Sequence, residues 1–408
     1  MSGPSLKVKL KQKNIRIKHQ KKKVFQATDP LLSVFMWGVN HSINELGHVN
    51  IPVMLMPDDF RAYSKIKVDY HLYNKENMPS HFKFKEYCPM VFRNLRERFG
   101  VDDSDYLNSL TRSQIVDFDL SGRSEGKFYQ SSDRLFVIKM LSSDEVGRMH
   151  SLLKQYHPYI VERHGKTLLP QYLAMYRLTV DNAESYFVVM RNIFSNHLPL
   201  HRKYDLKGST VDREASEKEK EKDLPTLKDN DLMKDGTKVI IGEEAKEKLV
   251  DTLTADVDFL MNLQLMDYSL LLGVHDCERY ANDLREGLVT EDSPFTDEDD
   301  SCGSGGETGK GGLGPTPPES PVAPRRRYKS GQIDPDFDIY AISSLDAQAK
   351  KEVYFLAIID ILTHYGVKKQ AAKAAKTVKY GANVDGISTI EPESYARRFL
   401  DFISKVIE

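Results

Sequence analysis

The chain has 408 residues, of which 40% are hydrophobic and 29% charged, and its formal net charge is −2. These values describe a soluble globular protein with one large core or two lobes, and no apolar run is long enough to cross a bilayer. The cysteines, Cys88, Cys277 and Cys302, follow no pattern, which excludes a disulfide framework or zinc knuckle and predicts a reducing compartment.

Residues 1–28 form a basic arm, rich in lysine, that contains no acidic residue before Asp29. Such a block attracts polyanions, and we expect anionic lipid rather than nucleic acid, because no aromatic residues are interleaved with the lysines and no nucleic-acid module follows. A merely solubilising arm is the alternative. The arm has no hydrophobic signal core, so we do not expect secretion.

The next segments predict the first elements of a folded region. From Asp29 to Glu45 the pattern indicates a helix, capped by its first residue and too apolar around its circumference to lie free on a surface. Alternation predicts strands at 64–70 and 82–87, and residues 89–99 indicate an amphipathic helix. Three arginines of that helix lie opposite its apolar face and are expected in solvent: Arg93, Arg96 and Arg98.

A glycine pair followed by an apolar strand is typical of a nucleotide-binding hairpin. Gly122 and Gly126 precede the strand predicted at 135–140. Small residues at a hairpin tip let backbone N–H groups approach phosphates, and Lys139 would reach the phosphates as a strand-borne lysine does in protein kinases. The glycines alone fit a plain turn equally well. A lysine within an apolar strand, however, needs a partner or a ligand.

Two further strands, predicted at 173–178 and 186–190, lead into a linker at 191–194. Such a linker holds an adenine ring through backbone groups, so Asn192 and Ile193 are candidates for nucleotide binding; a simple crossover weighs equally. Beyond it, Lys207 and Arg213 lie near a glycine, which suits a phosphate-bearing substrate.

Two carboxylates stand out in apolar surroundings. Asp267 lies between a helix predicted at 246–263 and a buried strand at 270–274. Asp360 interrupts the apolar run 353–362, where a carboxylate is costly unless it is paired or binds a cation. On adjacent strands the two would form the arrangement that Mg-assisted phosphoryl transfer needs. The alternative is that each merely caps a turn.

The remaining segments differ sharply in composition. Residues 214–231 are densely charged and predict a solvated loop or surface helix, and residues 279–335 are acidic and then rich in glycine and proline, which predicts disorder. Residues 365–385 are basic and glycine-bounded, which suggests a segment that senses an anionic surface. Residues 392–407 predict a closing amphipathic helix.

These motifs together resemble the phosphatidylinositol phosphate kinase family, and within it the type II branch. The resemblance covers nearly the whole chain. It rests on Trp-Gly-Val-Asn at Trp37, Pro-Val-Met-Leu-Met-Pro-Asp-Asp-Phe ending at Phe60, Phe-Lys-Phe-Lys-Glu-Tyr-Cys-Pro from Phe82, Asp-Leu-Lys-Gly-Ser at Asp205, Met-Asp-Tyr-Ser-Leu-Leu at Met266 and Ile-Ile-Asp ending at Asp360.

The resemblance implies a two-lobed α/β (α+β) fold related distantly to protein kinases. Its antiparallel-sheet N-lobe would span 29–190, and its smaller C-lobe would span 191–278 and 336–408, separated by the insert. It also implies homodimers through N-lobe strands, or heterodimers with paralogues, that lay a basic face on the membrane. Contact with type I phosphatidylinositol phosphate kinases through 53–59 is a further implication. We therefore expect a cytoplasmic protein, peripheral at the plasma membrane's inner leaflet or at endomembranes, with a nuclear pool left open.

The resemblance also assigns roles to individual residues. Asp267 and Lys139 would be catalytic, and Asp360 would bind Mg. ATP, or GTP, would be held by Lys139, Gly122, Gly126, Asn192 and Ile193. The lipid side would comprise Lys207, Arg213, Lys369, Ala372 and Lys373; type I kinases carry Glu where this chain has Ala372.

The implied reaction is transfer of the ATP γ-phosphate to the 4-hydroxyl of phosphatidylinositol 5-phosphate. Glu125, an acid in the glycine loop, keeps open a low-activity phosphoinositide-binding scaffold. A type I activity on phosphatidylinositol 4-phosphate is the other alternative, and a protein kinase is disfavoured because no Ala-Pro-Glu box follows Asp360.

Overall fold

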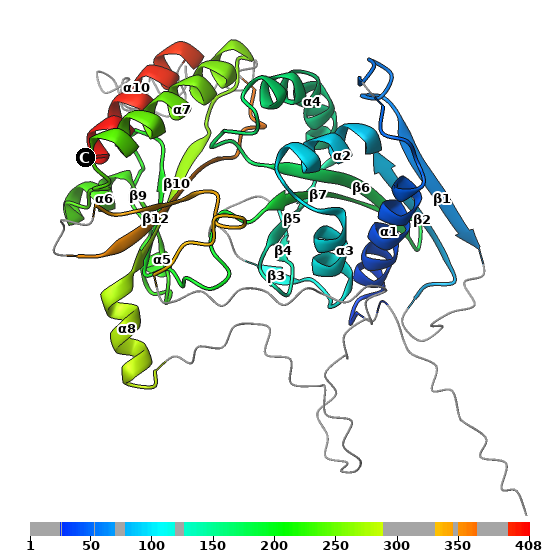
Figure 1. Cartoon of the computed structure of the whole chain (residues 1–408), viewed down its shortest axis with the longest axis horizontal. Coiled ribbons are helices and arrows are strands. Elements are labelled where there is room, and N and C mark those ends of the chain that lie inside the picture. Colours follow the sequence, from blue (N-terminus) through cyan, green and yellow to red (C-terminus); the bar gives the residue numbers. More distant parts are fainter. Residues whose placement is uncertain are drawn as a thin grey trace, which may run out of the picture.

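The computed structural model describes residues 25, 27–52, 54–69, 78–118, 126–288, 331–345, 350–364 and 391–408. It is a mixed α/β structure built on two sheets, one in each half of the molecule (Figure 1). The basic arm up to residue 24, Gly122, Glu125, Lys369, Ala372 and Lys373 lie outside the described residues. Within the described part, no helix is both long and apolar enough to span a membrane.

The first half is a seven-stranded antiparallel sheet in the order β1-β2-β6-β7-β5-β4-β3. Helices α1 and α2 pack against β6, and α4 packs against α2 and β5. The strands are β1 Tyr63–Asp69, β2 His81–Tyr87, β3 Val116–Phe118, β4 Phe128–Gln130, β5 Phe136–Leu141, β6 Tyr172–Val180 and β7 Ala183–Arg191. The helices are α1 Pro30–Gly47, α2 Pro89–Arg98, α3 Asp103–Thr111 and α4 Ser143–Glu162.

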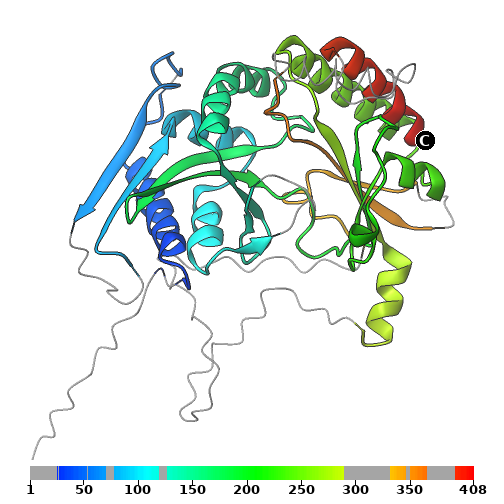
Figure 2. The ribbon, with the colours of Figure 1, turned by 180° about the vertical axis from the view of Figure 1, so that it is seen from behind.

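The second half is a five-stranded mixed sheet in the order β11-β12-β10-β8-β9, where only β8 and β9 run parallel. Helices α7 and α10 lie side by side on it, as the views from both sides show (Figures 1 and 2). The strands are β8 Arg202–Leu206, β9 Thr226–Lys228, β10 Ser269–Asp276, β11 Ala341–Ser343 and β12 Glu352–Ile359. The helices are α5 Glu217–Lys220, α6 Asp229–Asp235, α7 Glu243–Asn262, α8 Cys277–Arg285 and α10 Pro392–Val406.

Local sequence accounts for the ends of the helices that matter most. The Asp29 carboxylate accepts a hydrogen bond from the Leu31 amide at 2.8 Å and caps α1, as predicted. Helix α4 begins with a capping box, in which Ser142 accepts from the Glu145 amide and the Glu145 carboxylate accepts from the Ser142 amide. This box fixes the position of Glu145, whose side chain also reaches the site described below.

The prediction that three arginines of α2 lie in solvent is wrong for two of them. Arg96 is fully buried and donates to Asp103 at 2.9 Å and to the Leu173 carbonyl at 3.0 Å. Arg93 is half-buried and donates to two carbonyls near the end of α1, whereas Arg98 is exposed. The buried arginine is compensated by Glu86, a buried acid of β2 whose pKa burial raises and Arg96 lowers.

Two other boundaries differ from the sequence-based expectation. Within the charged segment 214–231, Asp229 and Asp231 are buried, because each accepts backbone hydrogen bonds from the loop before it. Strand β10 is followed directly by α8, which ends at Arg285. The folded chain therefore extends beyond residue 279, where the insert was predicted to begin. On the other side of the insert Asp334 is already buried.

Candidate active site

The two carboxylates singled out in the sequence lie at one edge of the five-stranded sheet. Strands β10 and β12 pair antiparallel, with Ser269 opposite Ile359. Asp267 lies just before β10 and Asp360 lies just after β12, so both residues lie at the same end of this strand pair. Pairing resumes beyond them, where the Met266 amide donates to the Thr363 carbonyl at 3.0 Å. Both aspartates have left-handed backbones, with φ of 66° and 61°. Such values are uncommon outside glycine and cluster at functional sites.

Lys207 contacts Asp267 from the neighbouring strand. It follows β8, which pairs with β10, and its Nζ donates to the Asp267 Oδ1 at 2.7 Å and to the Asp267 carbonyl at 2.8 Å. Both side chains are largely shielded, with 17% and 24% exposed. This two-point contact holds the Asp267 carboxylate in one orientation.

Arg213 sits in a buried ion-pair network beside this contact. Its Nε donates to the Asp229 Oδ2 at 2.6 Å, and its Nη2 donates to the Asp205 carboxylate at 2.7 Å and to the Asp205 carbonyl. Asp229 also accepts from the amides of Lys207 and Gly208. All of these bonds hold the loop that carries Lys207, so Arg213 stabilises the shape of the site.

Lys139 approaches from the seven-stranded half. It lies on β5 and pairs with Glu145 of α4 at 3.1 Å, with 14% and 20% of the two side chains exposed. Gly126 packs against it: a Cβ there would lie 3.6 Å from the Lys139 Cε and 3.3 Å from the Met140 carbonyl oxygen. Glycine therefore keeps the backbone close to the lysine.

Charged residues from both halves of the molecule shift the pKa of Asp360. The residue keeps an exposed surface, yet the protein packed around it from both sides raises the pKa of its carboxyl by desolvation. The ammonium groups of Lys139 and Lys207 lower this pKa, and the carboxylates of Asp205 and Asp267 raise it. The structure thus brings Lys139, Lys207, Asp267 and Asp360 within electrostatic reach of one another.

The linker at 191–194 is tightly fastened. The Asn192 amide donates to the Leu135 carbonyl, and its side-chain amide donates to the Arg134 carbonyl, both at 2.8 Å. Ile193 is buried. Arg191 donates to Gln171 and to the Phe99 carbonyl. Asn192 therefore uses both its backbone and its side chain to join β5 to the linker.

The donor set suits a hard cation that completes its coordination elsewhere. Among the described residues, no cluster of three or more His, Cys, Asp or Glu side chains could hold a metal by itself. Mg²⁺ does not need one, because it binds through one or two carboxylates and keeps water and phosphate oxygens as its other ligands. Asp360, with its exposed carboxylate among ammonium groups, fits that requirement.

Two residues of this arrangement were missed in the sequence. Glu145 could have been found, because Ser142-x-x-Glu145 after a predicted strand is a capping-box pattern. Asp229 gave no signal, since it lies among many other charges and its burial depends on a loop folding back over it.

The chain is similar to known proteins over almost its full length. A family profile described as Phosphatidylinositol-4-phosphate 5-Kinase matches residues 109–406. The chain is 57% identical over 404 residues to Phosphatidylinositol 5-phosphate 4-kinase type-2 alpha of Gallus gallus, which covers 98% of this chain and 96% of that protein. It is 57% identical over 391 residues to the type-2 beta protein of Homo sapiens, covering 95% and 92%. These matches span both sheets.

Proposed function

The chain belongs to the phosphatidylinositol phosphate kinase family, and from that premise we propose that it transfers the γ-phosphoryl group of ATP to the 4-hydroxyl of phosphatidylinositol 5-phosphate. The family profile is named for a 4-phosphate 5-kinase, whereas the full-length relatives are 5-phosphate 4-kinases. The relatives decide the regiochemistry, because they match 95–98% of the chain at 57% identity.

The observation that carries the proposal is the meeting of Asp267, Asp360, Lys139 and Lys207 between the two halves. This is the charge arrangement of a phosphoryl-transfer site, in which positioning and electrostatic stabilisation supply most of the catalysis. The two halves act as the N-lobe and C-lobe of a kinase, with the linker 191–194 between them and the insert, which follows α8, interrupting the second.

Each residue has a distinct task. The lipid 4-hydroxyl oxygen forms the new bond to the γ-phosphorus while the bond to the β-γ bridging oxygen breaks, and Asp267 orients the hydroxyl and accepts its proton. Lys207 keeps the Asp267 carboxylate in place. Lys139, fixed by Glu145, neutralises nucleotide phosphate charge. Asp360 would hold Mg²⁺, which would supply positive charge that offsets the charge of the phosphate groups.

The remaining binding roles follow the family. Gly126 leaves room for phosphates beside Lys139, with Gly122 in the same loop, and Ile193 lies at the linker where an adenine, or the guanine of GTP, would sit. On the lipid side, Lys207 adds positive charge beside Asp267, and Ala372 with Lys369 and Lys373 is assigned to selection of the 5-phosphate headgroup. Arg213 supports this surface from within rather than by direct contact.

The outer strands of the seven-stranded sheet support attachment to an anionic membrane. Lys65 lies opposite Lys85 and Lys67 opposite Lys83 on β1 and β2. Lys67 also pairs with Asp69 at 2.8 Å and Lys85 lies over the rings of Tyr63 and Tyr87, so the positive charge is only partly compensated within the sheet and can still attract an anionic surface. The strand β1 is also the sheet's edge, so a second copy can pair with it to form the homodimer, or a paralogue the heterodimer.

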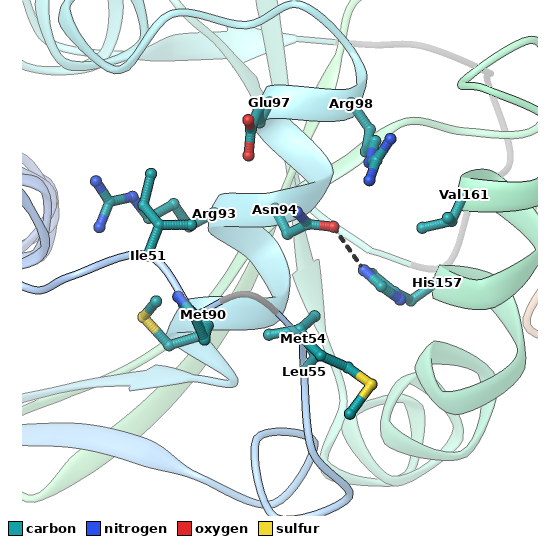
Figure 3. Close-up of a pocket in the computed structure, with 11 residues that line it drawn as sticks. Ile51, Met54, Leu55, Met90, Arg93, Asn94, Glu97, Arg98, His157 and Val161 are labelled. Carbon is teal, nitrogen blue, oxygen red and sulfur yellow. Dashed lines mark hydrogen bonds between the residues drawn. The ribbon is translucent and has the colours of Figure 1, made fainter.

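A groove beside α2 and α4 supports the contact with a type I kinase that the family implies. It has a cavity of about 180 Å³ that is lined by residues 51, 52, 54 and 55 and by those two helices (Figure 3). Two apolar residues on its rim are largely exposed, Ile51 at 58% and Met54 at 69%, and the Asn94–His157 hydrogen bond lies in its lining. Exposed apolar side chains of this size mark interaction surfaces.

Radiolabelled ATP and vesicles that contain one monophosphoinositide at a time test the proposal, with product regiochemistry determined afterwards. We expect phosphatidylinositol 5-phosphate to be phosphorylated on the 4-hydroxyl, with GTP compared as a second donor. Asp267→Asn should lose phosphorylation by a factor of about 10² to 10³ and bind vesicles as before. A preference for phosphatidylinositol 4-phosphate would refute the regiochemistry. Unchanged phosphorylation in Asp267→Asn would refute the assigned base.

A further inference from the structure

A buried carboxylate outside the site joins the two halves. Asp256 lies on α7 of the five-stranded half and is completely buried. Its Oδ1 accepts from the Tyr159 hydroxyl at 2.6 Å and from the Thr167 hydroxyl at 2.7 Å, and its Oδ2 accepts from the Leu168 amide at 2.6 Å. All three donors belong to the seven-stranded half, at the end of α4 and in the loop that follows. A buried acceptor with three donors is strongly specified.

The same loop also contacts the strand that carries Asp360. Leu168 donates its backbone N–H to Asp256, and its carbonyl accepts from the Ile358 amide at 2.7 Å. Ile358 lies in β12, immediately before the last residue of the strand that Asp360 follows. Tyr340 adds a further hydrogen bond to the Leu169 carbonyl at 2.9 Å. The backbone of one residue, Leu168, therefore bridges α7 and the strand that leads to Asp360.

Helix α4 links this junction to Lys139. Its carboxyl-terminal end is held by the Asp256–Tyr159 bond and by the stacking of Tyr159 on Phe259 of α7, with ring centroids 4.3 Å apart. Its amino-terminal turn carries Glu145, the partner of Lys139. Pro158 lies inside the helix one residue before Tyr159, so the anchored last turn restrains the rest of α4 through its packing on α2 and β5 and not as a straight rod alone.

We propose that Asp256 is a positioning residue, which fastens α4 and the following loop to the five-stranded half and so sets the placement of the Glu145–Lys139 pair relative to Asp360. The inference rests on the proposed kinase activity. Asp256 contacts neither substrate and acts only through α4 and β12. Without its carboxylate, two hydroxyls and one amide lose their acceptor where the halves meet, and the junction loosens although the Ile358–Leu168 and Tyr340–Leu169 bonds remain.

The test compares Asp256→Asn with Asp251→Asn, the same change at an exposed position of the same helix. Asp256→Asn should raise KM for ATP and lower kcat/KM by about tenfold to about 100-fold, because small misplacements of catalytic groups have effects of that size. Asp251→Asn should match the wild type, and vesicle binding should be unchanged in both. Tyr159→Phe removes one of the three bonds but keeps the ring on Phe259, and should give a smaller change in the same direction.

A double variant separates positioning from loss of stability. If Asp256 acts through Glu145, adding Asp256→Asn to Glu145→Gln should raise KM for ATP little beyond Glu145→Gln alone. Full additivity, or a lower kcat with unchanged KM for ATP in Asp256→Asn, would overturn the inference. If Asp256→Asn does not fold, Tyr159→Phe and Thr167→Val give the same comparison. Failure of the proposed substrate would appear in the wild type instead, and KM for ATP can then be measured with whichever lipid is phosphorylated.

Discussion

Replacing Arg213 with lysine separates a structural role from a lipid-binding one. The guanidinium bonds two carboxylates at once, Asp229 at 2.6 Å and Asp205 at 2.7 Å, and Asp229 is completely buried. Lysine keeps the charge but has a single ammonium that cannot span both. Removing one partner of a buried ion pair costs 3–5 kcal/mol, so retaining one of the two contacts leads us to expect a loss of about 2 kcal/mol in the free energy of unfolding.

The same change should slow catalysis more than it weakens lipid binding. The loop that carries Lys207 would lose its anchor, and the 2.7 Å contact with Asp267 would loosen, so we expect kcat to fall about tenfold with little change in KM for the lipid. Urea unfolding and initial rates at varied lipid surface concentration measure the two effects. Arg202→Lys is the control, because Arg202 lies on β8, pairs with Glu352 outside the Arg213 network, and has 35% of its side chain exposed. An Arg213→Lys protein with wild-type stability, unchanged kcat and a raised KM for the lipid would refute this reasoning.

Three further changes have defined outcomes. Glu145→Gln removes the charge partner of Lys139 at 3.1 Å and should raise KM for ATP about tenfold, equivalent to about 1.4 kcal/mol, in steady-state assays at saturating lipid; an unchanged KM would contradict this. Gly208→Ala places a Cβ 2.9 Å from the Arg398 carbonyl oxygen, at a φ of 65°. It should lower the free energy of unfolding by more than Gly236→Ala, where φ is 63° but nothing lies within 4 Å, so that only the backbone cost of about 1–2 kcal/mol applies. Equal losses in the two variants would exclude the steric contact. Burial raises the pKa of Asp256 from 3.8 to about 6, although the bonds from Tyr159, Thr167 and Leu168 and the charge of Arg163 lower it. The folded state therefore binds the carboxyl proton more tightly than the unfolded state does. The stabilisation that this provides is present below pH 3.8 and is lost as the pH rises through 6. Asp256→Asn stays neutral, so its stability relative to the wild type should improve by up to about 3 kcal/mol between about pH 4 and pH 7 in urea unfolding, and a constant difference would contradict the shift.

Much of the fold was predictable because periodicity and caps act locally. The helices at 29–45, 246–263 and 392–407 and the strands at 82–87 and 270–274 match observed elements, differing mainly at their ends. Each reflects apolar spacing along a single segment.

Contacts between distant segments set the limit of this reasoning. Helical spacing placed Arg96 opposite the apolar face, but it could not reveal that the buried acid Glu86 lies on β2 next to it. The meeting of Asp267 and Asp360 could be anticipated, since each is a lone carboxylate beside an apolar strand. The pairing of Arg213 with Asp205 and Asp229 could not, because it depends on how a charged loop folds back on itself.

The route of the chain between β10 and β12 has a consequence for how such a protein can change. The first strand ends at Asp276 and the second begins at Glu352, so the connection departs from and rejoins the margin opposite Asp267 and Asp360. Between Leu288 and Gly331 this connection can be lengthened, shortened or rewritten without changing the spacing of the two acids, because the ladder between the strands fixes that spacing. Sequence changes can therefore accumulate there, or a reporter domain can be inserted, while the placement of the two catalytic-site acids stays constant.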